Sequence, residues 1–310
     1  MWKYIIKRLL LIIPILLLVT FVVFYILNIT PGDPVRIILG LDAPQEAIDD
    51  LTEELGLNDP FLVRFFNYVK GVVHLDFGES YRSRTPVFEE IFPKMPTTLL
   101  LAVLIVTVST LIGVPLGILS AVKEYSALDI SLTVTSLIFA SIPGFWLGLM
   151  LIMVFSLKLG LLPSSGADSL KHFILPVMAT ALPAAAFNAR ITRTQMLEVM
   201  RQEYIRTARA KGASEKRVIW RHALKNTLMP VITLVGTSFA TCLGGSMITE
   251  TVFGLPGVGS HILTAIQSKD LPVVMASTLF LATTFMVIML IVDLIYAYIN
   301  PTIRSQFSRK

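Results

Sequence analysis

Charged residues are scarce in this chain. Asp, Glu, Lys and Arg make up 15% of the 310 residues, whereas hydrophobic residues make up 54%. Soluble globular domains carry about 25% charged residues, so the composition excludes an ordinary soluble fold. The apolar residues gather in segments of about 20 residues, which is the length that a helix needs to cross a bilayer. The composition therefore predicts a membrane protein with several spans.

Residues and motifs that carry catalysis or hold metals are also few. Cys242 is the single cysteine, so the chain cannot form an internal disulfide, and its apolar surroundings indicate packing. The four histidines (His74, His172, His222 and His261) are dispersed and form no H-E-x-x-H motif, which argues against a metal site. No G-x-x-x-x-G-K-[ST] motif is present, so the sequence offers no P-loop for ATP. The absence of G-x-S-x-G leaves an intramembrane protease as a weak rival class.

Six apolar segments reach the length of a membrane span. The first covers residues 9–27 and follows three basic residues. It is longer than the core of a cleaved signal peptide and lacks a small-residue cleavage site, so we expect it to be retained. The other five spans are expected at 97–121, 130–157, 172–189, 227–249 and 273–299. Basic residues flank both ends of the chain, so the predicted fold is an all-α bundle of six transmembrane helices with both termini cytoplasmic.

Small and polar residues within the spans indicate how the helices pack. Gly113 and Gly117 lie four residues apart, which lets membrane helices approach closely. Pro143 is expected to kink the third span. Asn188 is a lone amide near the inner end of the fourth span, and such a group usually bonds a neighbouring helix. We therefore expect these four residues to serve packing.

Residues 31–96 follow the first span and form the first long extramembrane segment. Within 31–95, twelve acidic residues outnumber six basic ones, which gives a net charge of −6. The positive-inside bias places such a segment outside the cell. Apolar residues recur at helical spacing through 46–72, and Asp59-Pro60 separates two helices. We expect these helices to cap the bundle.

The segment 190–225, which we call the elbow, is the long charged stretch in the second half of the chain. Ten basic residues oppose three acidic ones in it, a net charge of +7 against +5 for the whole chain. The pattern predicts a helix that ends at Gly212, where a glycine tolerates the left-handed conformation, and a second helix with Ser214 as N-cap. One face of the second helix carries four residues at helical spacing: Val218, Ile219, His222 and Ala223.

Charge alone leaves two interpretations of the elbow open. Membrane proteins retain lysine and arginine in their cytoplasmic loops, so a passive loop accounts for the charge. A docking site for a soluble partner accounts for the helix–glycine–helix order as well, which a passive loop does not need.

The residues of the elbow resemble the cytoplasmic signature of peptide-type ABC importer permeases. The runs that carry the resemblance are Glu203-Tyr204-Ile205-Arg206-Thr207-Ala208-Arg209-Ala210-Lys211-Gly212 and His222-Ala223-Leu224-Lys225-Asn226. The wider importer motif has the form Glu-Ala-Ala, three residues, Gly. Here Arg206 occupies the glutamate position and Thr207 replaces one alanine, a departure that the peptide branch shares. The resemblance therefore favours the peptide and nickel branch.

Further runs outside the elbow resemble the same branch. They are Pro31-Gly32-Asp33-Pro34, Leu55-Gly56-Leu57, Asp76-Phe77-Gly78-Glu79-Ser80 and the glycine- and proline-rich outer loop 250–259. The resemblance covers nearly the whole chain and implies a type I ABC importer permease bundle. Its expected parts are a first transmembrane helix (1–30), an extracytoplasmic helical segment (31–96) and a five-helix permease core (97–310).

The resemblance also implies partners and site residues. The partners are a second homologous permease, two ABC ATPase subunits that bind ATP and Mg, and an extracytoplasmic solute-binding protein that residues 31–96 could contact. The location is a bacterial or archaeal plasma membrane, with lipid around the spans and no nucleic acid. The residues implied to couple to an ATPase groove are Glu203, Tyr204, Arg206, Thr207, Ala208, Arg209, Ala210, Lys211 and Gly212. Among them, Ala208 is expected to face the ATPase.

The expected function is that of a peptide permease that forms half of a translocation pathway and is not itself an enzyme. Thr237, Ser238 and Thr241 lie on the most polar face of any span and are the candidate pathway residues. Dipeptides, oligopeptides, glutathione and nickel chelates remain open as substrates. An ion-coupled secondary transporter is the alternative of another class. Such proteins usually carry intramembrane charges and internal repeats, and here Asp293 is the clear charged candidate while no repeat is evident.

Overall fold

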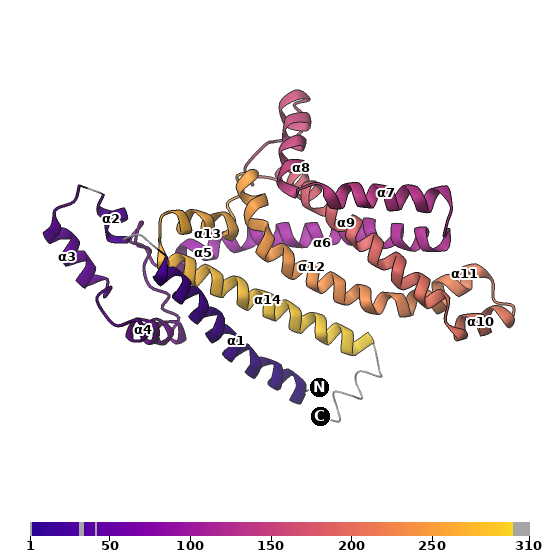
Figure 1. Cartoon of the computed structure of the whole chain (residues 1–310), viewed down its shortest axis with the longest axis horizontal. Helices are drawn as coiled ribbons and strands as arrows, with labels where there is room; N and C mark the ends of the chain where they lie inside the picture. Colours follow the sequence, from indigo (N-terminus) through magenta and orange to yellow (C-terminus); the bar gives the residue numbers. More distant parts are fainter. Residues whose placement is uncertain (1, 31–33, 41, 300–310) are drawn as a thin grey trace. The chain divides into compact units, whose positions relative to one another are not determined.

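The structure is a computed structural model that describes residues 2–30, 34–40 and 42–299, and the regular elements in these residues are helices (Figure 1). In chain order the helices are α1 (Trp2–Ile29), α2 (Pro34–Leu39), α3 (Gln45–Glu54), α4 (Phe61–Val73), α5 (Val87–Ile91), α6 (Met95–Val122), α7 (Ala127–Ser141), α8 (Gly144–Leu151), α9 (Lys171–Met200), α10 (Glu203–Ala210), α11 (Glu215–Arg217), α12 (Leu224–Val252), α13 (Val258–Gln267) and α14 (Leu271–Ile299). A 3₁₀ turn (Phe92–Lys94) precedes α6, and π-helical turns follow α8 (Ile152–Lys158) and α11 (Val218–Ala223). The predicted all-α class is confirmed.

The described helices include between four and six candidate membrane spans, compared with the six expected. Four stretches are long and apolar enough to cross a membrane alone: Arg8–Ile29, Val87–Val122, Lys171–Met200 and Leu271–Leu294. Two bent pairs raise the number to as many as six when each pair counts as one span: Ala127–Ser141 with Gly144–Lys158, and Glu215–Leu228 with Pro230–Gly244.

The third expected span is broken rather than kinked. Helix α7 ends at Ser141, α8 begins at Gly144, and the two helical stretches are bent by 95°. Pro143 has no N–H to donate and restricts the residue before it, so Ile142 is extended with ψ of 124°. Our expectation of a kink therefore underestimated the change of direction at this proline.

The chain divides into two compact units. One contains Leu99–Leu255 and the described residues from Val287 onward, and the other contains Trp2–Thr98 and Pro256–Met286. Helices α6 and α14 each begin in the second unit and continue into the first. The predicted division of the chain after residues 30 and 96 stays a prediction.

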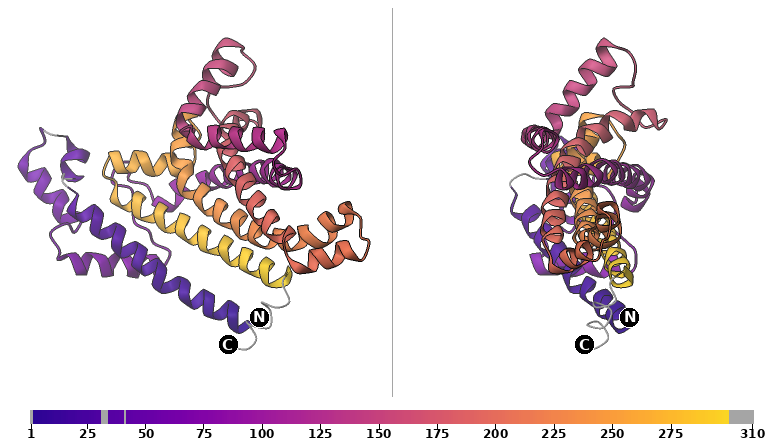
Figure 2. Two further views of the ribbon diagram at one scale, coloured as in Figure 1. Left: turned by 45° about the vertical axis from the view of Figure 1, so that its right-hand side comes forward. Right: turned by 90° about the vertical axis from the view of Figure 1, so that its right-hand side faces the viewer.

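Helix α9 is the central element of the first unit and packs against α7, α8 and α12 (Figure 1 and Figure 2). Helix α6 also approaches it closely at two glycines. A Cβ added at Gly113 would lie 2.5 Å from the carbonyl oxygen of Ala185, and one at Gly117 would lie 2.4 Å from that of Ala189. Because any side chain would collide there, the predicted close packing at this glycine pair is confirmed.

Buried polar contacts fix α6 and α7 to α9. Asn188 donates from Nδ2 to the hydroxyl of Ser109 on α6 at 3.5 Å, which confirms the expected bond to a neighbouring helix. Arg193 binds the buried carboxylate of Asp129 through Nε (2.7 Å) and Nη2 (2.8 Å). Ser120, near the end of α6, donates to the same carboxylate. Three helices therefore meet at Asp129, close to the start of the elbow.

In the second unit, the helices after the first span pack on that span. Helix α4 begins directly after Pro60, as the Asp59-Pro60 signal predicts. The ring of Phe65 on α4 lies 5.3 Å from that of Phe21 on α1, with the two planes almost perpendicular. Arg64 also donates to Asn28 at 2.9 Å. Aromatic packing and one polar contact thus hold α4 on α1.

A buried carboxylate joins two distant loops of the same unit. Asp270 precedes α14 and accepts hydrogen bonds from the hydroxyl of Ser80 and from the backbone N–H groups of Tyr81 (3.2 Å) and Arg82 (3.3 Å). Asp270 is 3% exposed. We call this contact the outer latch. It anchors the loop that begins with the Asp76-Phe77-Gly78-Glu79-Ser80 run.

Candidate functional site

The elbow has the helix–glycine–helix order that the sequence predicts, with one added break. Helix α9 ends at Met200, an extended Gln202 follows with ψ of 147°, and α10 begins at Glu203. The helix that ends at Gly212 is therefore short and separate from α9, which itself runs into the first part of the elbow.

The end of α10 has the geometry that its glycine predicts. Gly212 has φ of +80°, in the left-handed region. Its N–H donates to the carbonyl of Arg209 at 2.9 Å, and the N–H of Ala213 donates to the carbonyl of Ala208 at 3.2 Å. This pair of bonds is a Schellman motif, in which the glycine occupies the C′ position. The predicted left-handed glycine is confirmed.

The second half of the elbow begins at Ser214, which occupies the N-cap position of α11 as predicted. Its side chain makes no capping hydrogen bond, so that part of the prediction is wrong. The apolar face predicted for this half is confirmed, because Val218 and Ala223 are fully buried and Ile219 packs beside them.

A small hydrophobic core fixes the elbow to the bundle. Its buried members are Ala121 of α6, Met196 of α9, Ile205 of α10, and Val218 and Ala223 before α12. All of them are at most 2% exposed. Burial of an isoleucine or methionine side chain contributes about 1.5–3 kcal/mol. The core therefore holds α10 against the ends of two membrane helices, and α10 cannot slide over them without exposing it.

Helix α10 has one buried side and one exposed side. Ile205 is fully buried, and Ala208, one turn further on, is half-buried. Glu203, Thr207 and Ala210 are exposed and lie on the opposite side at helical spacing. The expectation that Ala208 faces a partner is therefore better transferred to Ala210, because Ala208 lies beside the internal anchor.

Polar contacts hold the two halves of the elbow together across Gly212. Arg209 donates to Glu215 from Nε at 2.8 Å and from Nη2 at 3.3 Å, and these bonds raise the pKa of the Arg209 guanidinium. Asn226 of α12 donates to the Tyr204 hydroxyl at 2.6 Å. Both pairs are exposed, so each contributes about 0–1 kcal/mol. They orient the elbow, while the apolar core supplies most of its attachment.

The nine predicted coupling residues lie in one continuous stretch, from Glu203 through Gly212. Sequence reasoning missed the residue that sets the orientation of this stretch, Ile205, although it is the one large aliphatic residue in α10. It also missed the contact between Asp129 and Arg193, which fixes α9 near the start of the elbow.

The candidate pathway residues lie apart from the elbow, along α12. Thr237 and Thr241 are exposed and one turn apart, and Ser238 is half-buried. The Thr237 hydroxyl donates to the carbonyl of Leu234 at 2.9 Å, and the Thr241 hydroxyl donates to the carbonyl of Thr237 at 3.0 Å. Their donors are thus satisfied within the helix, while their oxygens can still accept hydrogen bonds. Their role in a pathway stays a prediction.

Within the described part of the chain, no group of three or more His, Cys, Asp and Glu side chains is placed to hold a metal ion. The site is therefore built from a helix, a glycine turn and a buried apolar anchor. Such an arrangement suits a contact with another protein.

Comparisons with known families and proteins cover nearly the whole chain. Residues 113–305 match the family model described as "Binding-protein-dependent transport system inner membrane component", and residues 1–102 match the model for the N-terminal part of such membrane components. The chain is 41% identical to the dipeptide transport system permease protein DppB of Alkalihalophilus pseudofirmus, across 98% of this chain and 100% of the relative. It is also 41% identical to the glutathione transport system permease protein GsiC of Salmonella typhimurium, across 98% of this chain and 99% of the relative.

A solved structure shares the fold. A chain of the MetNI methionine ABC transporter, in an inward-facing conformation, superposes with a TM-score of 0.56 at 19% sequence identity. The superposition covers 68% of this chain and 96% of that one.

Proposed function

We propose that this chain, which belongs to the family of binding-protein-dependent transport system inner membrane components, is the permease subunit of an ATP-driven peptide importer. It forms half of the translocation pathway and docks an ATPase subunit through α10. The observation that carries the docking role is the form of α10. One side of the helix is anchored to α6 and α9 by Ile205, and the other side is exposed.

The importer has further subunits. A second homologous permease completes the pathway, two ATPase subunits bind ATP and Mg, and an extracytoplasmic solute-binding protein delivers the solute. The chain itself hydrolyses no ATP, which agrees with the absence of a P-loop motif from its sequence. The description of the matching family as binding-protein-dependent supports the delivery step.

The elbow acts as a mechanical link. When the ATPases close on ATP, they move the exposed side of α10. The buried core around Ile205 and Met196 passes this movement to the ends of α6 and α9, because close-packed interiors transmit displacement rather than absorb it. The bundle then switches between inward-facing and outward-facing states around a pathway that includes Thr237, Ser238 and Thr241.

The substrate class is peptidic. The relatives named for dipeptide and for glutathione transport are equally similar to this chain, so glutathione, itself a small peptide, is the alternative substrate. A nickel chelate is a further alternative from the sequence resemblance. Binding assays with the solute-binding protein that serves this permease, using a dipeptide, a longer peptide, glutathione and a nickel chelate, distinguish these solutes.

The topology follows from charge. The acidic segment 31–95 is extracytoplasmic, and the elbow and both termini are cytoplasmic, in the inner membrane of a bacterium or in an archaeal plasma membrane. This orientation puts α10 on the side where ATP is available.

Reconstitution tests the proposed function against an ion-coupled secondary transporter. The complete complex in liposomes should take up peptide only with ATP inside and the solute-binding protein outside. The chain alone should transport nothing and hydrolyse no ATP. Peptide uptake by the chain alone, driven by an ion gradient, would contradict the proposal and favour the secondary transporter.

A further inference from the structure

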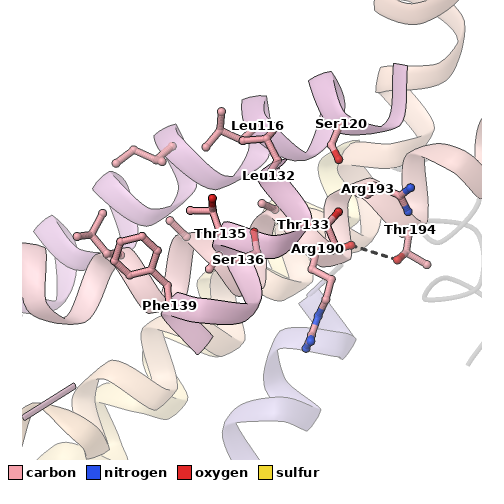
Figure 3. A pocket seen from close by; sticks show the side chains of 15 residues that line it. Leu116, Ser120, Leu132, Thr133, Thr135, Ser136, Phe139, Arg190, Arg193 and Thr194 are labelled. Atoms are coloured by element: carbon pink, nitrogen blue, oxygen red, sulfur yellow. Dashed lines mark hydrogen bonds between the residues drawn. The ribbon is translucent and has the colours of Figure 1, made fainter. Parts of the chain in front are cut away.

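A groove of about 200 Å³ lies between α6, α7 and α9 (Figure 3). It is lined by side chains of these three helices alone, near the end of α9 that leads into the elbow. The pathway candidates on α12 do not line it. The groove therefore needs an explanation separate from peptide transport.

The polarity of the lining changes from one end of the groove to the other. On α9 the lining runs from Leu182 through Ala186 and Arg190 to Thr194, and on α6 it runs from Ile112 to Ser120. The path from Leu182 to Arg190 and the path from Ile112 to Ser120 each advance eight residues, or about 12 Å at the rise of an α-helix. The groove thus has an apolar part deeper in the bundle and a polar, basic end toward the elbow.

Arg190 supplies a positive charge at the polar end. Its side chain is exposed, and its guanidinium carbon lies 5.7 Å from the centre of the Phe187 ring. Arg193, which also lines the groove, is paired with Asp129 at 2.7 Å. Within the described residues, no carboxylate forms an ion pair with Arg190. The charge of Arg190 is therefore available to a ligand.

Hydroxyl groups stand beside this charge. Thr133 and Ser136 of α7 line the same groove as Arg190 (Figure 3). The Thr194 hydroxyl, by contrast, is occupied by the Arg190 carbonyl at 3.1 Å. A guanidinium with neighbouring hydroxyls is a donor set that suits a phosphate group.

We propose that this groove binds an anionic phospholipid, with an acyl chain along the apolar part and the phosphate at Arg190. A phospholipid carries an apolar chain and a charged headgroup, and these match the apolar part and the basic end of the groove. A peptide would instead leave backbone polar groups without hydrogen-bond partners against the apolar lining, which is unfavourable. Basic pockets between membrane helices on the cytoplasmic side are suited to anionic lipid headgroups.

The bound lipid would brace the root of the elbow. Its headgroup lies next to the place where Ser120, Asp129 and Arg193 join α6, α7 and α9. A lipid here would stabilise the arrangement of these helices, whichever solute the importer carries. The inference is thus independent of the peptide assignment.

Native mass spectrometry of the complete importer tests the lipid site. The complex is titrated in detergent with dioleoyl phosphatidylglycerol or dioleoyl phosphatidylethanolamine. Arg190→Gln should weaken phosphatidylglycerol binding about fivefold and leave phosphatidylethanolamine binding nearly unchanged. Arg190→Lys should retain most of the affinity, because it keeps the charge. Arg217→Gln, which removes an exposed positive charge of the elbow outside the groove, is the matched control and should have no effect.

A second variant tests whether the lipid lies inside the groove. Ser136→Phe adds bulk at the half-buried wall of α7 and should reduce the binding of both lipids. Equal phosphatidylglycerol affinity in wild type and Arg190→Gln would overturn the proposal, as would unchanged binding in Ser136→Phe. Loss of the second permease from the Arg190→Gln complex would also overturn it, since the groove would then be a subunit interface.

Discussion

The elbow and the outer latch attach extramembrane segments to membrane helices in opposite ways. The elbow is strongly basic, yet its attachment is apolar, through Ile205 and the small core around it. The loop at Ser80 belongs to an acid-rich segment, and it is held by hydrogen bonds to the buried carboxylate of Asp270. Net charge thus indicates on which side of the membrane a segment lies. The buried contacts determine whether movement of that segment passes to the membrane helices. An apolar core transmits displacement, and a hydrogen-bonded latch fixes a loop in one position.

The largest expected effect concerns the two sides of the membrane. In the assembled importer in intact cells, Asp49→Cys should react with a membrane-impermeant thiol reagent, and Lys216→Cys should react only after permeabilisation. Both positions are exposed in the chain. A variant in which Cys242 is replaced by serine provides the background. Labelling of both positions from the same side would contradict the six-span topology, in which the elbow and the outer latch lie on opposite sides of the membrane.

The next effect tests the apolar attachment of the elbow. Ile205→Ala should destabilise the packing of α10 by about 2–5 kcal/mol, because it opens a cavity in a fully buried core. We expect membrane insertion to persist and substrate-stimulated ATP hydrolysis by the complex to fall steeply. Thr207→Ala, on the exposed side of the same helix, is the control for stability. Normal coupling in Ile205→Ala would show that the core does not transmit movement.

Loss of the outer latch should change the rate of amide hydrogen exchange rather than the coupling to ATP hydrolysis. In Asp270→Asn the charge that holds the Ser80 hydroxyl and two amides is lost, at a cost of about 1–3 kcal/mol. Hydrogen–deuterium exchange of the Tyr81 and Arg82 amides should accelerate about tenfold or more. The exposed neighbour Glu79→Gln should leave exchange unchanged. Unchanged exchange in Asp270→Asn would mean that the latch does not hold the loop.

The smallest effect concerns the exposed ion pair of the elbow. Arg209→Gln removes the bonds to Glu215, whose side chain is 61% exposed, so we expect a loss of about 0–1 kcal/mol. The thermal stability of the complex and its ATPase coupling should change far less than in Ile205→Ala. An equal or larger loss of coupling in Arg209→Gln would mean that the ion pair, rather than the core, sets the position of α10.

Local signals in the sequence predicted the local structure well. The apolar runs became long helices, Gly212 adopted the left-handed conformation, and Gly113 and Gly117 became the close contact with α9. Each of these features depends on a few neighbouring residues or on a property of glycine itself. The family signature in the elbow is equally local.

Features that depend on distant contacts could not be predicted. The pair of Asp129 and Arg193 joins residues 64 positions apart, and the outer latch joins Ser80 to Asp270 across 190 positions. The rotation of α10, which turns Ala208 inward, depends on the core that forms around Ile205. Pro143 indicated a change in helix direction, but the size of the bend depends on the packing of α7 and α8 against α9.

Co-purification of the ATPases with Ala210→Trp tests whether the exposed side of α10 docks an ATPase subunit. Ala210 is exposed beside Thr207, so a tryptophan there should block docking without disturbing the core. Ala127→Trp makes the same change at an exposed alanine at the start of α7 and should retain the ATPases. Gly212→Val strains the left-handed turn by about 1 kcal/mol or more and should weaken coupling to a lesser degree. Ala210→Trp should insert normally and lose the ATPases. Normal co-purification and coupling in this variant would show that the exposed side of α10 is not the docking site.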